Sequence, residues 1–241
     1  MRSFATLLSL IICGTAFAAE TPAVPPAKAP PKAGRTCRVL FLAAPENAPK
    51  TIFLNDGAST QPIELPSLNL SNVYKLSPGD ITLRLTPTLP TEQQPIPVGA
   101  PMVAVPEAVK DFYLLVSSDP KNPVAPLKCQ VVNANPEGFR SGQMMWLNLT
   151  PYQVGGQLGS RTLNLKPNSQ SLVDSPKDSA GSYSVKIGYN PGKDQKPALI
   201  VSTEWPHNPS GRNIVFVMML PNSKIPRIKG FSDYREPQKA Q

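Results

Sequence analysis

The sequence has a single histidine, His207, and only three cysteines among its 241 residues. Zinc and most transition-metal sites need three or four ligands, usually several His or Cys side chains. The closely spaced acidic ligands of a calcium loop are missing as well, because no Asp-x-Asp-x-Asp run occurs. The most glycine-rich stretch, residues 155–159, lacks the Lys-Ser/Thr pair of a phosphate-binding loop. We therefore expect neither a metal nor a cofactor.

Signatures of catalysis are also missing. His207 could serve a Ser-His-Asp triad with Asp174 or Asp178 as its acid, but no Gly-x-Ser-x-Gly elbow marks a nucleophile. The 16 acidic residues are thinly spread, and a lysine interrupts their densest stretch, Asp174-Ser-Pro-Lys-Asp178, which does not suit a glycosidase carboxylate pair. We interpret His207 as a loop residue and predict no catalytic residues. The alternative is a hydrolase of a cell-wall or polysaccharide substrate.

Beyond the N-terminus, no apolar run reaches the roughly 20 residues that span a bilayer. The N-terminus itself has the parts of an export signal, namely Arg2, an apolar run over residues 4–12, and Ala16-Phe-Ala18 as a small-x-small cleavage site. We predict that residues 1–18 are a signal peptide and that the mature protein is secreted, periplasmic or at the cell surface. Cys13 leaves lipidation open, although the bulky Ile12 stands where lipoprotein signals have a small residue.

Removal of the signal leaves two cysteines, Cys37 and Cys129. Exported proteins meet oxidising conditions, where an even cysteine count favours a disulfide. We predict a Cys37–Cys129 bond that acts as a structural staple and not as a site. In the chain-entropy model, a disulfide that closes the long loop between these two cysteines stabilises the folded state by about 4–5 kcal/mol. The alternative is a pair of buried thiols in strands.

The chain is basic, with a formal net charge of +8. A basic exported protein can adhere to phospholipid headgroups, cell-wall polymers or acidic polysaccharide. Lys and Arg are scattered along the chain, which argues against nucleic acid as a partner, as does the export signal. We expect an anionic cell-surface polymer or a protein as partner; the alternative is that the charge serves solubility alone.

Proline is abundant, with 30 residues. Long helices and central strands hold few prolines, and no segment shows a sustained 3.6-residue period. Residues 19–35 are too rich in Pro and Ala to form a core, so we predict an extended linker there; the alternative is an unstructured N-terminus left after signal cleavage. From residue 36 onwards short strands and turn signals recur, such as Asn55-Asp-Gly57 and the alternating Ile81-Thr-Leu-Arg-Leu85. This pattern predicts an all-β fold.

Two segments about one hundred residues apart resemble each other. Residues 112–116 (Phe-Tyr-Leu-Leu-Val) lead through a turn with Pro and Asn to Leu127-Lys128, and residues 215–219 (Val-Phe-Val-Met-Met) lead through a similar turn to Arg227-Ile-Lys229. Further pairs match in order: residues 37–40 with 129–132, 52–55 with 145–148, 73–79 with 162–168, and 102–105 with 198–201. We predict an internal duplication that forms two antiparallel β-sandwich domains in tandem, at residues 36–128 and 129–235.

Several motifs of the first half occur together. They are Arg38-Val-Leu-Phe41, Ala44-Pro-Glu-Asn-Ala-Pro49, Ile52-Phe-Leu-Asn-Asp-Gly57, and Tyr74-Lys-Leu-Ser-Pro-Gly79 leading into Ile81-Thr-Leu-Arg-Leu85. With these motifs residues 37–85 resemble an exported bacterial family of immunoglobulin-like β-sandwich domains of unknown function. The resemblance implies an immunoglobulin-like fold for the two tandem antiparallel sandwiches, an extracytoplasmic location and no catalytic residues.

Four aromatic side chains of the second half, Trp146, Tyr152, Tyr189 and Trp205, form a candidate ligand platform. An aromatic face can stack on a sugar ring or a proline, although buried core positions are the alternative. We therefore predict an exported, non-catalytic envelope or cell-surface binding or structural protein whose ligand is open. A further alternative is a subunit of a surface assembly, because the linker and exposed strand edges would suit one.

Overall fold

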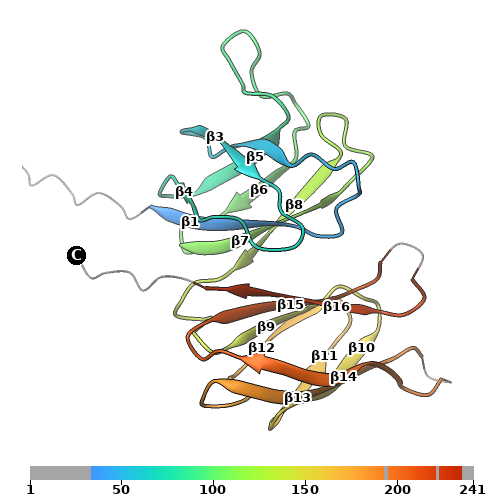
Figure 1. Ribbon diagram of the computed structural model, residues 1–241. Coiled ribbons are helices and arrows are strands. Elements are labelled where there is room, and N and C mark those ends of the chain that lie inside the picture. The colour runs from blue at the N-terminus through green and yellow to red at the C-terminus, as the bar shows by residue number, and fades with distance from the viewer. Residues whose placement is uncertain (1–33, 193–194, 221–222, 235–241) are drawn as a thin grey trace, which may run out of the picture. The chain divides into compact units, whose positions relative to one another are not determined.

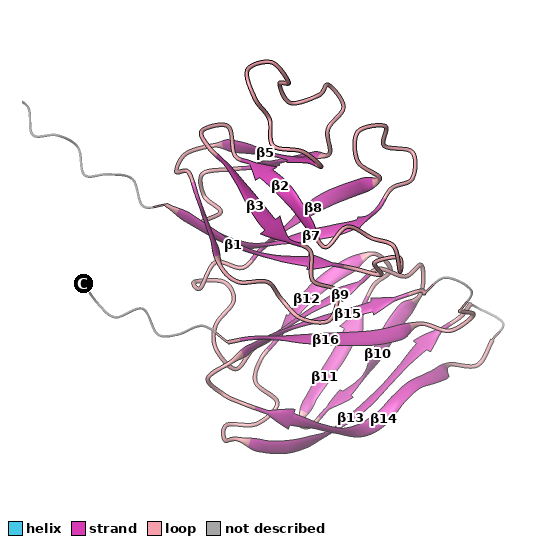
Figure 2. Ribbon diagram, turned by 45° about the horizontal axis from the view of Figure 1, so that its top comes forward, coloured by secondary structure: helices cyan, strands magenta, loops and turns pink. Residues whose placement is uncertain are grey.

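A computed structural model describes residues 34–192, 195–220 and 223–234 (Figure 1). The described residues form sixteen β-strands and no helix (Figure 2). None of them therefore belongs to a helix long and apolar enough to cross a membrane. The predicted signal peptide, Cys13 and most of the predicted linker lie outside the described residues. Arg35, predicted to end the linker, instead opens the first strand and is buried, and its guanidinium donates hydrogen bonds to the carbonyls of Val105 (2.7 Å) and Gly79.

The first eight strands form a sandwich of two four-stranded sheets, with strand orders β4-β1-β7-β8 and β3-β2-β5-β6. The strands are β1 (Arg35–Phe41), β2 (Thr51–Asn55), β3 (Thr60–Glu64), β4 (Tyr74–Leu76), β5 (Ile81–Thr86), β6 (Met102–Val105), β7 (Asp111–Ser118) and β8 (Leu127–Asn133). Strands β1 and β7 are parallel, and all other pairs in this sandwich are antiparallel. A hydrophobic core fills the space between the two sheets.

The last eight strands repeat this arrangement with the strand orders β12-β9-β15-β16 and β11-β10-β13-β14. They are β9 (Met144–Asn148), β10 (Gln153–Leu158), β11 (Arg161–Leu165), β12 (Ser169–Val173), β13 (Gly181–Asn190), β14 (Ala198–His207), β15 (Arg212–Met218) and β16 (Arg227–Asp233). Each strand number is eight higher than that of its counterpart, and β9 and β15 form the parallel pair. The prediction of an all-β chain with two tandem β-sandwiches is confirmed.

The second sandwich also has a hydrophobic core between its two sheets. The two sandwiches share a third hydrophobic core, and their described residues belong to one compact unit. The shared core lies between the sheets that contain β1, β7, β9 and β15, so four sheets lie in layers (Figures 1 and 2). Its main members are Leu40, Tyr113, Leu115, Met145, Leu147, Ile214, Phe216, Met218 and Phe231. Strands β7 and β15 are covered on both faces. This explains their uninterrupted apolar sequences, the most similar segments of the two halves.

The strand pairing corrects the finer matches between the two halves. Residues 129–132 lie in β8, which pairs with β7, whereas the matched residues 37–40 lie in β1. The counterpart of β1 is β9, which holds residues 145–148, the segment that the sequence matched to β2. Short apolar strands resemble one another whatever their place in a sheet. Matching the strands of the two halves by their order along the chain therefore paired strands that are not counterparts. The predicted boundary at residue 129 falls inside β8, and the first sandwich runs through Asn133.

The predicted disulfide between Cys37 and Cys129 is wrong. Strand β7 lies between their strands, with Cys37 opposite Phe112 and Cys129 opposite Val116. Four residues along a strand span about 13 Å and two strand spacings about 10 Å, so the two Cα atoms are roughly 16 Å apart. A disulfide needs Cα atoms within about 7 Å. Burial raises the pKa of the Cys129 thiol to about 11, so this thiol stays protonated at neutral pH.

Candidate functional site

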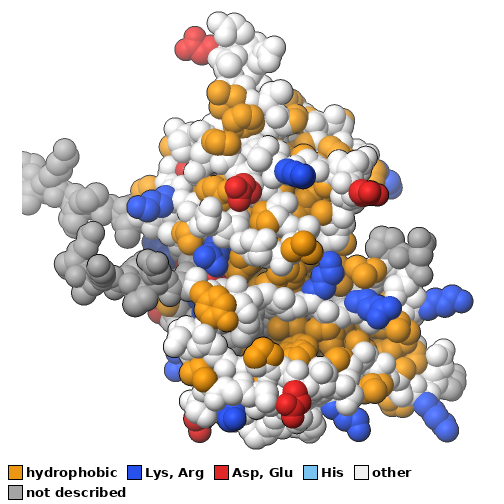
Figure 3. Space-filling view, in the orientation of Figure 1, with side chains coloured by type: hydrophobic (Ala, Val, Ile, Leu, Met, Phe, Trp, Pro, Cys, Tyr) orange, Lys and Arg blue, Asp and Glu red, His pale blue; other side chains and the backbone are white. Residues whose placement is uncertain are grey.

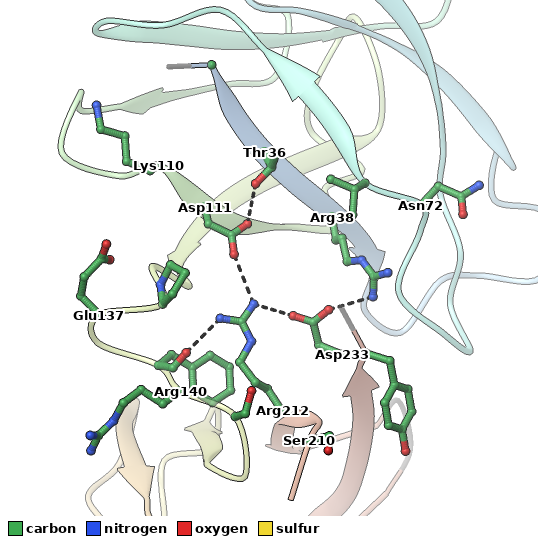
Figure 4. Close-up of a pocket in the computed structure, with 16 residues that line it drawn as sticks. Thr36, Arg38, Asn72, Lys110, Asp111, Glu137, Arg140, Ser210, Arg212 and Asp233 are labelled. Atoms are coloured by element: carbon green, nitrogen blue, oxygen red, sulfur yellow. Dashed lines mark hydrogen bonds and ion pairs between the residues drawn. The ribbon is translucent and has the colours of Figure 1, made fainter. Parts of the chain in front are cut away.

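A cleft opens where the two sandwiches meet (Figure 4). It has a volume of about 1360 Å³. The starts of β1, β7 and β15, the end of β16 and the segment that joins the two sandwiches form its walls. The shared core lies directly beneath these strand ends, so the packing of the sandwiches fixes the walls of the cleft.

Arg212, the first residue of β15, is at the centre of the inner wall. Its Nη2 atom lies 2.7 Å from Asp233 Oδ2 and 3.2 Å from Asp111 Oδ2. Its Nη1 atom donates to the backbone carbonyls of Ala134 (2.8 Å) and Phe139 (3.0 Å), and its guanidinium lies 4.8 Å from the centre of the Phe139 ring. One guanidinium therefore joins the first sandwich, the connecting segment and the second sandwich.

Asp233, at the end of β16, receives two more donors. Arg38 Nη1 lies 2.8 Å from its Oδ1 atom, and the Tyr113 hydroxyl donates to its Oδ2 atom at 2.6 Å. The Asp233 side chain is fully buried, and such a carboxylate needs this many donors to stay charged. Asp111 also accepts a hydrogen bond from Thr36 Oγ1 at 2.9 Å.

The pKa of Arg212 reflects this environment. Burial works against its charge, but Tyr113, Asp233 and Asp111 outweigh that effect and raise the pKa above the ordinary arginine value. Arg212 is therefore cationic at every physiological pH. The inner wall holds two guanidinium groups and two carboxylates, which neutralise each other.

The outer part of the cleft carries further charges. Lys110 and Arg140 are exposed there, together with Glu137 (Figure 4). The charged lining residues comprise four bases (Arg38, Lys110, Arg140, Arg212) and three acids (Asp111, Glu137, Asp233), a net charge of 4 − 3 = +1. Because the inner acids are already paired, the exposed bases favour an anionic group in the cleft.

No local sequence motif marks the residues of this cleft, and they were not predicted from the sequence. A usable signal was a charged residue at the start of a doubly buried strand, since such a residue is rarely buried unless it is paired. Asp111 and Arg212 both fit this description. They are 101 residues apart, so only the packing of the two sandwiches shows that they meet.

His207 is the last residue of β14 and is buried, so its interpretation as a loop residue is wrong. Its Nε2 atom lies 2.9 Å from Ser175 Oγ. Burial lowers the pKa of His207 and outweighs the opposing effect of a hydrogen bond with the Lys177 backbone, and the charge of Lys177 makes a smaller contribution that also lowers it. Ser175 donates its hydroxyl hydrogen to the Lys177 carbonyl, and Asp174 accepts a hydrogen bond from Gln143 (2.8 Å). Within the described residues this pair has the geometry of satisfied polar packing, without the carboxylate of a triad.

The four aromatic residues predicted as a platform do not form one exposed surface. Trp146 is fully buried in β9, a strand between two cores, and its ring stacks on Trp205 with centroids 5.8 Å apart and planes 9° apart. Tyr189 is also buried and contacts the half-buried Tyr152, with ring centroids 5.3 Å apart. Of the four, only Trp205 lines a surface groove.

Among the described residues no group of three or more His, Cys, Asp or Glu side chains is placed to hold a metal ion. No protein-family model matches the chain, and no curated protein matches it. The resemblance of residues 37–85 to exported immunoglobulin-like domains stays a prediction.

Proposed function

We propose that this chain is an exported, non-catalytic envelope or cell-surface binding protein that holds an anionic surface polymer in the cleft between its sandwiches. The observation that carries the proposal is the pair of exposed bases, Lys110 and Arg140, on a cleft whose inner acids are neutralised. The polymer class is defined by its repeated carboxylate, sulfate or phosphate groups.

The size and rigidity of the cleft support this proposal. Sites for small ligands occupy about 300–1,000 Å³, and this cleft is larger and open, which suits a segment of a polymer. The shared core fixes both walls, so a ligand would not have to order them on binding. The net charge of +8 adds a long-range attraction for anionic surfaces.

Titration of the protein with polygalacturonate, dextran sulfate and neutral dextran tests this proposal. We expect both polyanions to bind and neutral dextran not to bind. The Lys110→Ala/Arg140→Ala double variant should weaken binding about tenfold at low salt, because two exposed ionic contacts contribute about 0.5–1 kcal/mol each.

The matched control is Lys166→Ala/Lys186→Ala, which removes two exposed bases of the second sandwich away from the cleft. This control should bind nearly as tightly as the unmodified protein. Equal losses in the two double variants would show diffuse charge attraction without a site, and would refute the assignment to the cleft.

A hydrolase is the second candidate, and the contact between Ser175 and His207 is the observation that favours it. A serine nucleophile must give its proton to the imidazole, whereas the Ser175 hydroxyl hydrogen points to the Lys177 carbonyl. We therefore expect a fluorophosphonate probe to leave Ser175 unlabelled. If the probe labels Ser175, and this labelling is lost in a His207→Ala variant, the hydrolase would become the favoured function.

A further inference from the structure

The second sandwich has a groove on its open side, between the outer strands β14 and β16. The groove has a volume of about 360 Å³. Its lining includes Tyr183 and Trp205 from one sheet and Met144, Val215, Ile228 and Gly230 from the other. In the space-filling view hydrophobic side chains gather between β14 and β16, with Lys and Arg side chains around them (Figure 3).

Comparison of the two copies explains the groove. Strand β8 of the first sandwich and strand β16 of the second occupy the same position in their sheets. Val131 lies opposite Leu114 in β8, and its side chain packs on the first core. Gly230 lies opposite Val215 in β16 and offers no side chain to the second core. The side chain of Val131 therefore fills a space in the first sandwich that stays empty beside Gly230 in the second.

The lining of the groove is suited to apolar side chains. Trp205 forms one wall and is held in place by its stacking on the buried Trp146. Ile228 and Val215 supply aliphatic surface, and a polar end is provided by Ser232, whose hydroxyl donates to Asn213 Oδ1 at 2.9 Å.

The backbone beside the groove is also open to a partner. Among the described strands β16 pairs with β15 alone, so its other edge presents N–H and C=O groups that no described strand pairs. Along β16 the side chains alternate: Ile228, Gly230 and Ser232 face the groove, while Arg227 and Lys229 face the opposite side of the sheet.

We infer that this groove binds an extended peptide segment of a protein partner, with apolar residues at alternate positions and carboxylates between them. The segment adds to the edge of β16 as a further strand. Its apolar side chains enter the hollow left by Gly230, and its carboxylates lie beside Arg227 and Lys229, as cross-strand neighbours of opposite charge do. This site is separate from the cleft between the sandwiches.

The probe is a capped nine-residue peptide of alternating valine and glutamate, followed by calorimetry and by the fluorescence of Trp205. We expect a dissociation constant well below about 1 mM. Two altered probes test the chemistry: lysine in place of glutamate, and N-methylation of the amides that would face β16. Each should weaken binding at least tenfold.

The decisive variant is Gly230→Val, which copies Val131 of the first sandwich. A Cβ atom at Gly230 would have Val215 Cγ2 as its nearest neighbour, at 3.9 Å, so valine fits without backbone strain. We expect this variant to keep the thermal stability of the unmodified protein and to lose peptide binding at least tenfold. The control is Ser184→Val, which adds the same side chain on an exposed strand position away from the groove.

Three results would overturn the inference. They are unchanged binding in Gly230→Val, equal binding of the N-methylated peptide, and no binding of the valine–glutamate peptide up to about 1 mM. The Lys110→Ala/Arg140→Ala variant should bind the peptide normally. If this variant lost peptide binding, the acidic peptide would be bound in the cleft and not in the groove. Polyanion binding by Gly230→Val should be unchanged, so the groove and the cleft can fail independently.

Discussion

Replacement of Asp233 by alanine tests whether the buried ionic network holds the two sandwiches together. Asp233 accepts hydrogen bonds from Arg38 at 2.8 Å, from Arg212 at 2.7 Å and from Tyr113 at 2.6 Å. The variant leaves Arg212, whose side chain is only 7% exposed, with Asp111 at 3.2 Å as its remaining carboxylate. Loss of one partner of a buried ion pair costs about 3–5 kcal/mol, because the other charge stays buried.

The expected loss follows from these contacts. Tyr113 also loses its carboxylate acceptor, which costs about 1–3 kcal/mol for a buried donor, whereas Arg38 is partly exposed and regains water. Arg212 keeps two backbone carbonyls, which reduces its penalty. We expect Asp233→Ala to lower the free energy of unfolding by about 4 kcal/mol, a large share of the 5–15 kcal/mol typical of folded proteins.

Urea unfolding monitored by tryptophan fluorescence measures this loss. The urea concentration at the unfolding midpoint should fall by about 1.5 M, if the free energy of unfolding changes by about 2.5 kcal/mol per molar urea. Asp233→Asn keeps the shape and one acceptor oxygen, so its loss should be about half as large. Lys110→Ala, at the exposed end of the same cleft, should stay within about 0.5 kcal/mol. A loss below about 1 kcal/mol for Asp233→Ala would refute the view that this network stabilises the fold.

Three further predictions concern other parts of the molecule. Phe216→Ala in the shared core should lower the free energy of unfolding by about 3–5 kcal/mol in the urea assay, because Phe216 is fully buried. Protein purified without reductant should show no Cys37–Cys129 cross-link by mass spectrometry, and alkylation of Cys129 should accelerate only as the pH approaches about 11, the pKa of its thiol. The lowered pKa of His207 means that its neutral form is favoured in the fold, so its contribution to stability should be present above its ordinary value of 6.5 and be lost as the pH falls below it. A His207→Gln variant should show a flatter dependence of the urea midpoint on pH in that range.

Turn chemistry made the local parts of the fold predictable. Asn55-Asp-Gly57 was expected to form a hairpin, and it joins β2 to β3. Asp56 accepts hydrogen bonds from the backbone of Ala58 and Ser59, and Gly57 takes a φ of 91°. Such features depend on a few neighbouring residues, so a sequence contains all the information that decides them.

Long-range pairing could not be predicted in the same way. The parallel contact of β1 with β7 joins residues about 75 apart, and nothing near β1 selects β7 over another apolar strand. The disulfide between Cys37 and Cys129 was predicted from an even cysteine count, which does not say which strands lie side by side. The cleft depends in addition on the packing of the two sandwiches, because Asp111 and Arg212 meet only after both sandwiches have formed and packed together.

In both candidate sites, residues at corresponding positions of the repeated fold differ in their chemistry. Asp111 opens β7 and Arg212 opens β15, so corresponding strand starts face each other across the shared core and form an ion pair at 3.2 Å. A symmetric pair of identical chains would place like residue against like at such a position. Because the two copies are joined in one chain, one could become acidic and the other basic. The same freedom let Val131 fill the first sandwich while Gly230 leaves the second open. The two sandwiches therefore share their strand order and differ at these positions of the cleft and the groove.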